Sequence, residues 1–537
     1  MTHRQFASLS STKHTMGKGK RKGSAGSSSG DGRNGDQKTL RSAVEKAVNE
    51  AVNLQDSASD LPALQAAAAL ESAAQRYREA LTRLPGHAEA GYNLATCLSE
   101  QADLKLDSRE QVSLLRESRA VLESVIEADT SGRGGTTALA HHALGNVIRS
   151  LVEVFRDHCP TAPCADCCVG CPSTAECKEQ SSQACRHLEA SVSIIKNLQN
   201  QSGGTEEVLI HWGDAFASMM QMVMDEGSAG RSTSDHLPPS DTVQEALELC
   251  SNACSKYSEA LALDTSSGGS DTDVLRLKAG SLMNFLDWAL PEIPKQPPNG
   301  VGFSPEVLLV TGEQTVGMLL GLDDNNVGGL LAKGDLCRLR ARVSMLTGAG
   351  MQEEGARREE SVAWFERAVG GYPQDAEALT TAGEGLLEHG RRTMAVYREV
   401  AWPAQGGYGS TVAPAPHVER LRMSAVTWLQ DAGNLLSSAC AIDTSDTDLP
   451  YNAACAFALS GDHTSCFRAL SEFCRRLTLT LTIAAAASSG GVSSSKRDAA
   501  RWSLREVEDD VDLESVREAG WFIDLLRGTN ATLVGGP

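Results

Sequence analysis

Cysteine is the residue type that gathers most densely along the chain. Seven of the fifteen cysteines lie within residues 158–187. Two pairs with two intervening residues follow each other directly there, Cys164 with Cys167 and Cys168 with Cys171. Four thiolates can hold zinc in a tetrahedron, but these pairs overlap more closely than those of a regular two-knuckle zinc finger. The segment is therefore either a structural zinc site on these four cysteines or a redox-labile loop, with an iron–sulfur cluster as a third reading.

Histidine is the other residue type that could do chemistry at neutral pH. His141, His142, His211 and His463 all fall on helical patterns, and none has a nucleophile at a useful spacing. The sequence contains no phosphate-binding loop, no G-x-S-x-G, no H-E-x-x-H and no protein-kinase signature. We therefore expect a protein that is not an enzyme.

The composition favours helices as the elements that position these residues. Hydrophobic residues make up 41% of the chain, enough for a substantial core, but aromatic residues make up only 4%. The chain is rich in Ala, Leu, Glu, Ser and Arg, which suit helices better than strands. The sequence predicts an all-α protein.

One spacing of small and bulky residues recurs along the chain. Ala73, Tyr77, Ala80, Leu81 and Pro85 stand at offsets 0, 4, 7, 8 and 12. Small residues at offsets 0 and 7 let a neighbouring helix approach closely, and the aromatic residue fills the space between them. The same ladder returns, more or less closely, in residues 118–130, 253–265, 361–373 and 432–444.

A second ladder consists of an apolar residue, then Ala or Gly, then an apolar residue three positions on. Leu94, Ala95 and Leu98 form one copy, and others have their small residue at Gly145, Gly213, Gly383 and Ala454. The two ladders together resemble helix B and helix A of the tetratricopeptide repeat (TPR). In that family the small residue of helix B lies 22 residues before the small residue of the next helix A. The same separation occurs here between Ala73 and Ala95, Ser361 and Gly383, and Ala432 and Ala454.

The resemblance implies a right-handed superhelical solenoid of antiparallel helix pairs with long insertions inside the repeats. About eight pairs are expected in residues 38–480, with the Cys-rich insertion at 158–187. A Ser/Gly-rich linker is expected at 481–497, and residues 498–537 are expected to cap the open end of the stack.

The resemblance also implies a binding groove and a function. In the TPR family helix A lines the concave face, and the residues two before and one after its small residue point into it. A non-catalytic scaffold or adaptor that binds a protein segment there is the function implied; a zinc-binding or redox-responsive protein acting through the Cys-rich insertion is the alternative. Chaperone-binding members clamp a terminal carboxylate with basic residues, but Leu139 and Ala143 stand where such a pair would be needed, so no clamp is expected. The groove residues implied are Asn93, Thr96, Asn146, His211, Asp214, Lys278, Lys333, Asp335, Glu384 and Asn452.

Charge constrains the partner and the location. The chain carries 49 Lys and Arg against 69 Asp and Glu, a net charge of −20. A surface this acidic repels nucleic acid and anionic lipid, so a basic or neutral protein or peptide is the expected partner. No run of 18 apolar residues occurs, and we expect a cytoplasmic protein. Residues 1–37 are basic and Ser/Gly-rich and are expected to be disordered; their cluster Lys18–Lys22 would support nuclear import as an alternative.

Overall fold

A computed structural model was obtained for the 537-residue chain. The structure describes residues 33–59, 61–105, 108–129, 135–158, 172–197, 205–228, 240–263, 270–290, 304–347, 351–404, 416–444, 446–487, 504–505 and 507–535. These described residues form helices joined by turns, without a β-strand. The expected fold class, an all-α solenoid of antiparallel helix pairs, is confirmed. Among the described helices, none combines the length and apolar character that crossing a bilayer requires.

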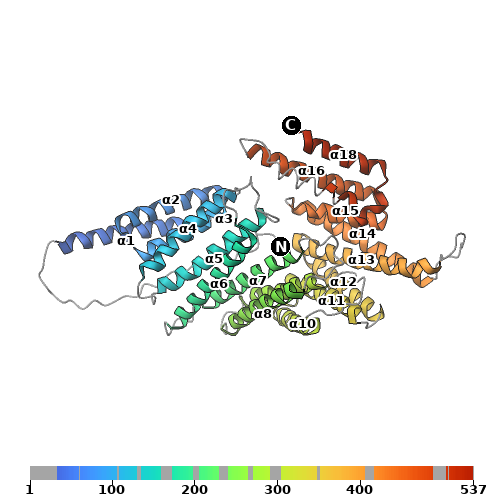
Figure 1. Cartoon of the computed structure of the whole chain (residues 1–537), viewed down its shortest axis with the longest axis horizontal. Coiled ribbons are helices and arrows are strands. Elements are labelled where there is room, and N and C mark those ends of the chain that lie inside the picture. Colours follow the sequence, from blue (N-terminus) through green and yellow to red (C-terminus); the bar gives the residue numbers. More distant parts are fainter. Residues whose placement is uncertain are drawn as a thin grey trace. The chain divides into compact units, whose positions relative to one another are not determined.

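The helices follow one another as long rods (Figure 1). A short 3-10 helix, η1 (Val511–Val516), and α18 (Gly520–Gly535) lie at the C-terminal end. The preceding helices are α1 (Arg33–Ala58), α2 (Ala63–Arg83), α3 (Ala88–Asp103), α4 (Ser108–Ala128), α5 (Gly135–His158), α6 (Thr174–Asn197), α7 (Thr205–Ser228), α8 (Ser240–Leu263), α9 (Ser270–Ala289), α10 (Pro305–Leu322), α11 (Val327–Thr347), α12 (Met351–Gly371), α13 (Ala376–Ala404), α14 (Pro416–Ile442), α15 (Asp448–Ser460) and α16 (His463–Ala487).

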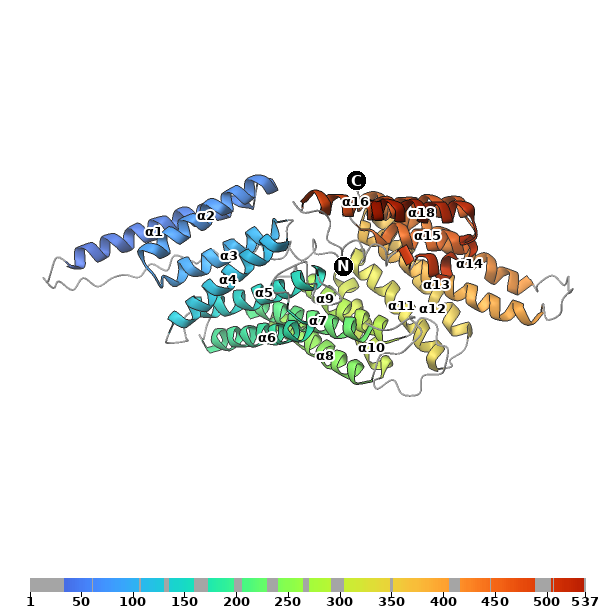
Figure 2. The same ribbon diagram turned by 45° about the horizontal axis from the view of Figure 1, so that its top comes forward.

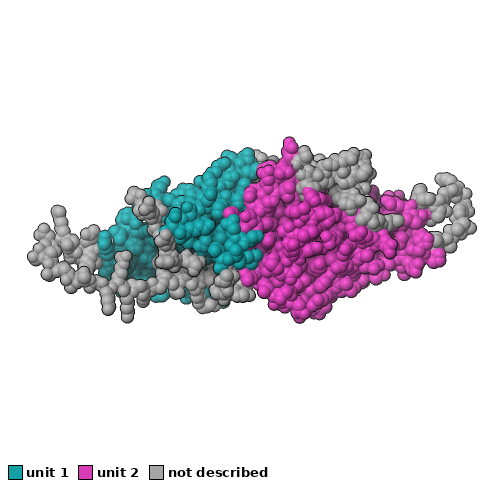
Figure 3. Space-filling model, turned by 90° about the horizontal axis from the view of Figure 1, so that it is seen from below, with its two compact units in different colours: residues 1–163, 168–222, 258–263 teal, residues 164–167, 223–257, 264–537 magenta. Residues whose placement is uncertain are grey.

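The chain divides into two compact units, coloured separately in Figure 3. Unit 1 contains residues 1–163, 168–222 and 258–263, and unit 2 contains residues 164–167, 223–257 and 264–537. From α1 to α6 in unit 1, and from α9 to α16 in unit 2, each helix packs against its neighbour in sequence, as α3 does on α4 and α13 does on α14 (Figure 2). Odd-numbered helices are here called A helices, and several contact the next A helix of the same unit, as α1 does with α3 in unit 1 and α11 with α13 in unit 2. This pattern of nearest-neighbour stacking is that of a helical repeat protein.

The small residues of the two sequence ladders meet inside each repeat. In unit 1 the Ser118 hydroxyl donates to the Ala95 carbonyl at 2.8 Å, which joins α4 to α3. In unit 2 the Ser361 hydroxyl donates to the Gly334 carbonyl at 2.7 Å, which joins α12 to α11. A Cβ added at Gly383 would lie only 2.7 Å from Leu436 Cγ, so α13 and α14 approach too closely for any side chain there. The anchors therefore meet although the number of residues between them varies, because helices such as α13 and α14 extend well beyond the anchors.

Three helices extend beyond the boundaries expected from sequence. Helix α1 begins at Arg33, inside the segment expected to be a disordered tail, and α16 continues to Ala487, past residue 480. Helix α6 begins at Thr174, so the second half of the expected Cys-rich insertion is helical. Its start is a capping box, because the Ser173 hydroxyl accepts from the Glu176 amide at 3.3 Å and Glu176 accepts from the Ser173 amide at 2.6 Å.

The C-terminal segment covers the apolar end of unit 2. Leu513, Val516 and Phe522 are buried in the same cluster as Leu470 and Phe473 of α16. Trp521 and Leu525 are partly buried against the cluster. Val511, at the start of η1, is 69% exposed and does not contribute to it.

Overpacking tests the repeat register. Ala80 of α2 and Ala368 of α12 have no exposed surface. Replacing either with Leu should lower the free energy of unfolding by about 1–3 kcal/mol, because the added atoms force the neighbouring helix away. Thermal denaturation of each variant measures the effect. Ala68→Leu on the exposed face of α2 is the matched control and should melt like the wild type; equal melting of all three variants would mean that the register is wrong.

Candidate functional site on the A helices

The ten expected groove residues all lie on A helices, and together they are called the A-helix row. Unit 1 holds Asn93 and Thr96 on α3, Asn146 on α5, and His211 and Asp214 on α7. Unit 2 holds Lys278 on α9, Lys333 and Asp335 on α11, Glu384 on α13, and Asn452 on α15.

In each unit, row residues of two successive A helices meet. In unit 1 the Asn146 Nδ2 atom of α5 lies 3.0 Å from His211 Nδ1 of α7. In unit 2 the Asn452 amide of α15 donates to Glu384 Oε1 of α13 at 3.3 Å. Asn146 and Glu384 each directly follow the small residue of their own A helix. His211 and Asn452 each lie two positions before the small residue of the next A helix. The same register thus places the row residues of successive A helices beside each other in both units.

The row residues differ in how much surface they offer. Asn93, Thr96 and Asn146 are half-buried, and Glu384 is exposed. Asp214 is buried, with 7% of its surface exposed, so it offers a partner little area.

Helix α1 continues the row at its N-terminal end. Gln55 of α1 donates to Glu100 of α3 at 3.0 Å and accepts from the Tyr77 hydroxyl of α2 at 3.0 Å. The Gln55 amide nitrogen also lies 3.5 Å from Thr96 Oγ1. Gln55 is a neighbour of the row that the sequence ladders did not reveal, because α1 carries neither ladder clearly.

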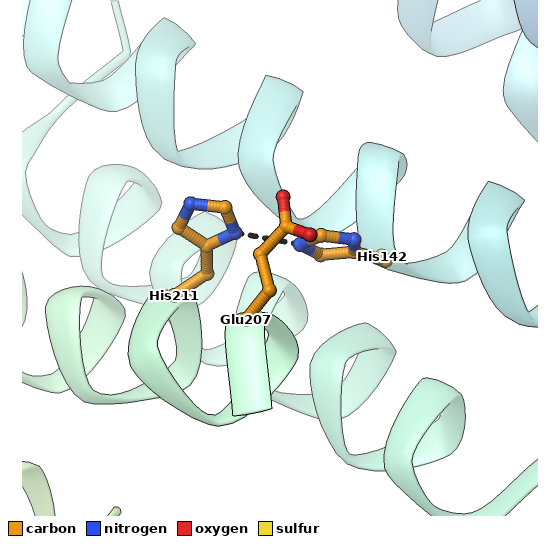
Figure 4. Close-up of side chains that lie close together, drawn as sticks. All are labelled: His142, Glu207 and His211. Atoms are coloured by element: carbon orange, nitrogen blue, oxygen red, sulfur yellow. Dashed lines mark hydrogen bonds between the residues drawn. The ribbon is translucent and has the colours of Figure 1, made fainter. Parts of the chain in front are cut away.

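Two histidine pairs lie on opposite sides of α5. His142 Nε2 lies 2.6 Å from His211 Nδ1 of α7, and the rings stack with centroids 4.9 Å apart (Figure 4). His141, the next residue, turns to α6, where its Nδ1 lies 2.9 Å from His187 Nδ1. Burial lowers the pKa of His211 well below the ordinary histidine value, with a further contribution from His142. Burial and His141 together lower the pKa of His187 to about 4. The imidazoles of His187 and His211 are therefore neutral at physiological pH.

Unit 2 contains a buried charge network that sequence analysis missed. Arg342 of α11 is 2% exposed and forms two hydrogen bonds to Glu388 of α13, at 2.8 and 2.6 Å. Arg338 of α11 also pairs with Glu388 and reaches Asp287 of α9 at 2.9 Å. Burial alone would raise the pKa of Glu388, but Arg338 and Arg342 hold it well below the ordinary range. The network fastens three successive A helices together.

A second part of the network joins α12 to α13. Glu354 of α12 accepts from Arg358 at 3.2 Å and from Arg392 of α13 at 3.0 Å. Arg358 also donates to His389 Nδ1 at 3.0 Å. Burial, together with the charge of Arg358, lowers the pKa of His389 to about 3, so this ring stays neutral. The arrangement fixes helix positions and leaves His389 with no exposed surface.

The four cysteines expected as zinc ligands, Cys164, Cys167, Cys168 and Cys171, lie outside the described residues, as does the basic cluster Lys18–Lys22. The zinc reading of the Cys-rich segment therefore stays a prediction. Cys185, at its far end, is buried on α6, and burial raises the pKa of its thiol to about 12.

Comparison with known proteins identifies no family for the chain. No family model matches it, and no curated protein matches it. Among solved structures, Nro1, a hypoxic regulator of sterol synthesis described as a nuclear import adaptor, has 12% identity and a TM-score of 0.32 over 91% of this chain and 99% of that chain. A circular tandem repeat protein has 12% identity and a TM-score of 0.28 over 93% and 97%. A monomeric mutant of IFIT1 with Gppp-AAAA has 11% identity and a TM-score of 0.26 over 82% and 90%. TM-scores this low assign no activity or ligand, and it is the stacking of its own helix pairs that makes this chain a helical repeat protein.

Proposed function

We propose that the chain is a non-catalytic adaptor of the TPR type that binds a protein segment along the A-helix row. The observation that carries this proposal is the contact between row residues of successive A helices in each unit. Asn146 meets His211 in unit 1 and Glu384 meets Asn452 in unit 2 at the same two register positions. Polar side chains from successive repeats thereby form a strip that suits an extended chain better than a small molecule.

The chemistry of the strip favours a peptide backbone. Asn93 and Asn452 each carry a donor and an acceptor, which can pair with the amide and carbonyl groups of a segment lying in either direction. The net charge of −20 favours a basic or neutral segment over an acidic one and disfavours nucleic acid. Binding of this kind weakens as salt screens the charges. The adaptor is proposed to act in the cytoplasm, with import through Lys18–Lys22 as the route to the nucleus.

A matched pair of variants tests the proposal. The row variant replaces Asn93, Thr96 and Asn146 with Ala, and the control variant replaces Gln65 and Gln75, exposed neutral residues of α2, with Ala. Partners that co-purify with the wild type should be retained by the control. Their affinity for the row variant should fall at least about tenfold, because interface side chains that contribute to binding cost about 1 kcal/mol or more each.

Circular dichroism of both variants verifies the helical fold before binding is compared. Equal loss of partners from both variants, or no loss from the row variant, would place binding elsewhere on the chain. If the wild-type protein retards single-stranded RNA in a native gel at about 0.15 M salt, the exclusion of nucleic acid is wrong.

A further inference from the structure

Three possible metal ligands converge between α5 and α7 in unit 1. They are His142, Glu207 and His211, and one donor atom from each lies within 4.8 Å of the other two. His142 is 9% exposed, and Glu207 and His211 are half-buried, so the donors are held by packing and still open to solvent. Figure 4 shows the Glu207 carboxylate beside the two facing rings.

The helices present these ligands from rigid positions. Glu207 and His211 stand at i and i+4 on α7, and His142 and Asn146 stand at i and i+4 on α5, so each pair shares one helix face. The facing helices are joined beyond the cluster by the Ser218 hydroxyl of α7, which donates to Glu153 of α5 at 3.2 Å. Met219 and Met222 of α7 also pack in the apolar cluster of α5. Metal sites in helical bundles are built in this way, from side chains that project inward from facing helices.

The hydrogen-bond pattern within the cluster is poor without a cation. His142 Nε2, His211 Nδ1 and Asn146 Nδ2 lie within 3.2 Å of one another. If one of the two ring nitrogens donates its proton to the other, the lone pair of the accepting nitrogen is occupied. The Asn146 amide, which is also a donor, then has no lone pair left to bind on either ring nitrogen. The Asn146 Oδ1 atom is buried and has no hydrogen-bond partner among the described residues.

We propose that His142, Glu207 and His211 bind one divalent transition-metal ion of borderline softness, of which Zn²⁺ is the best match. Two neutral imidazoles and one carboxylate form a ligand set that zinc takes in proteins, with a fourth position for water. Both ring lone pairs then point at the ion, and the bound water donates to the Asn146 carbonyl oxygen. The ion ties the A helices of two successive repeats together at the row itself.

The cluster needs only a small adjustment to accept the ion. Zinc–nitrogen bonds of about 2.0–2.1 Å place tetrahedral ligands roughly 3.3 Å apart. The two ring nitrogens are 2.6 Å apart, so they must separate by about 0.7 Å. Rotation about the side-chain torsions of the two histidines supplies this movement without displacing either helix.

Zinc titration of the full-length chain tests the site. Cys164, Cys167, Cys168 and Cys171 are first replaced with Ser, so that thiolates of the Cys-rich segment do not compete for the metal. Isothermal titration with Zn²⁺ should then give one ion per chain. His142→Ala and His211→Ala should each weaken binding at least about 100-fold, because even loss of a residue that only orients a ligand typically costs 10–100-fold. Glu207→Gln should weaken it roughly tenfold or more.

His141→Gln is the matched control, since His141 faces α6 and pairs with His187. The affinity of this variant for Zn²⁺ should equal that of the parent.

Co²⁺ is the second probe. Its absorption should show the visible bands of a nitrogen and oxygen site without the intense near-ultraviolet bands of thiolate ligation. If His142→Ala fails to fold, Glu207→Gln decides, because Glu207 lies in the first turn of α7 and is only half-buried.

Absence of Zn²⁺ binding in the cysteine-replaced chain would overturn the proposal. The proposal would also be wrong if the Glu207→Gln and His211→Ala variants bound Zn²⁺ as tightly as the parent. It would be wrong, too, if His141→Gln lost as much Zn²⁺ affinity as the ligand variants. The readout is separate from partner binding, so a failed zinc titration leaves the proposed adaptor function standing.

Discussion

Glu388→Gln is expected to lower the free energy of unfolding of unit 2 by about 3–5 kcal/mol. The change is nearly isosteric, but it removes the buried carboxylate that pairs with both Arg338 and Arg342, and Arg342 is only 2% exposed. Asp287 remains 2.9 Å from Arg342, but its side chain is 45% exposed, so it offsets less of the desolvation cost of the buried guanidinium. Hydrogen exchange of amides in α11 and α13 measures the effect locally, which is appropriate for a chain with two units.

Glu399→Gln is the matched control for this prediction, since Glu399 is an exposed residue of the same helix. It should change the free energy of unfolding by less than about 0.5 kcal/mol.

The stabilisation from Glu388 should be constant at neutral pH, because its folded-state pKa is depressed. It should decline only as pH falls below the unfolded carboxyl pKa of about 4.3 towards the folded value. A Glu388→Gln variant as stable as the control would contradict the network's structural role.

Phe522→Ala is expected to destabilise the C-terminal end of unit 2 by about 3–5 kcal/mol. Phe522 is 1% exposed in the cluster that η1 and α18 share with α15 and α16, and its removal leaves a cavity at the end of the stack. Val511→Ala is the matched control, because Val511 lies nearby in sequence but is 69% exposed. Hydrogen exchange in α15 and α16 should accelerate strongly in the first variant and remain unchanged in the second. Equal exchange in both would show that the segment does not cap the solenoid.

Sequence periodicity predicted the contacts that repeat. The separation of 22 residues between Ser361 and Gly383 predicted that their helices, α12 and α13, are adjacent. On another side of α13, the absence of a side chain at Gly383 lets Leu436 of α14 approach closely. Ser118 and Ala95 were identified only as small residues, yet small residues on facing helices are what allows the hydrogen bond between them. Such features are visible in sequence because every repeat must solve the same packing problem.

Contacts that occur once were not predictable in this way. Arg342 and Glu388 are 46 residues apart, and their pairing depends on how α11 and α13 are placed by the helices between them. The row register identified Asn146 and His211 but missed His142 and Glu207, which lie one turn earlier on the same helices. The i and i+4 spacing of His142 with Asn146, and of Glu207 with His211, was a signal that could have found them.

The direct test of the central claim, that the A-helix row binds a protein segment, is site-specific photo-crosslinking. A benzophenone amino acid is placed at Asn93 of unit 1, at Glu384 of unit 2, or at the exposed control position Gln75 of α2, one position per chain. Irradiation in cell extract, followed by mass spectrometry of the adducts, then reports what lies against each position. The account predicts adducts with segments of partner proteins from Asn93 or Glu384 and none from Gln75. Adducts from Gln75 alone, or with RNA in place of protein at the row, would contradict it.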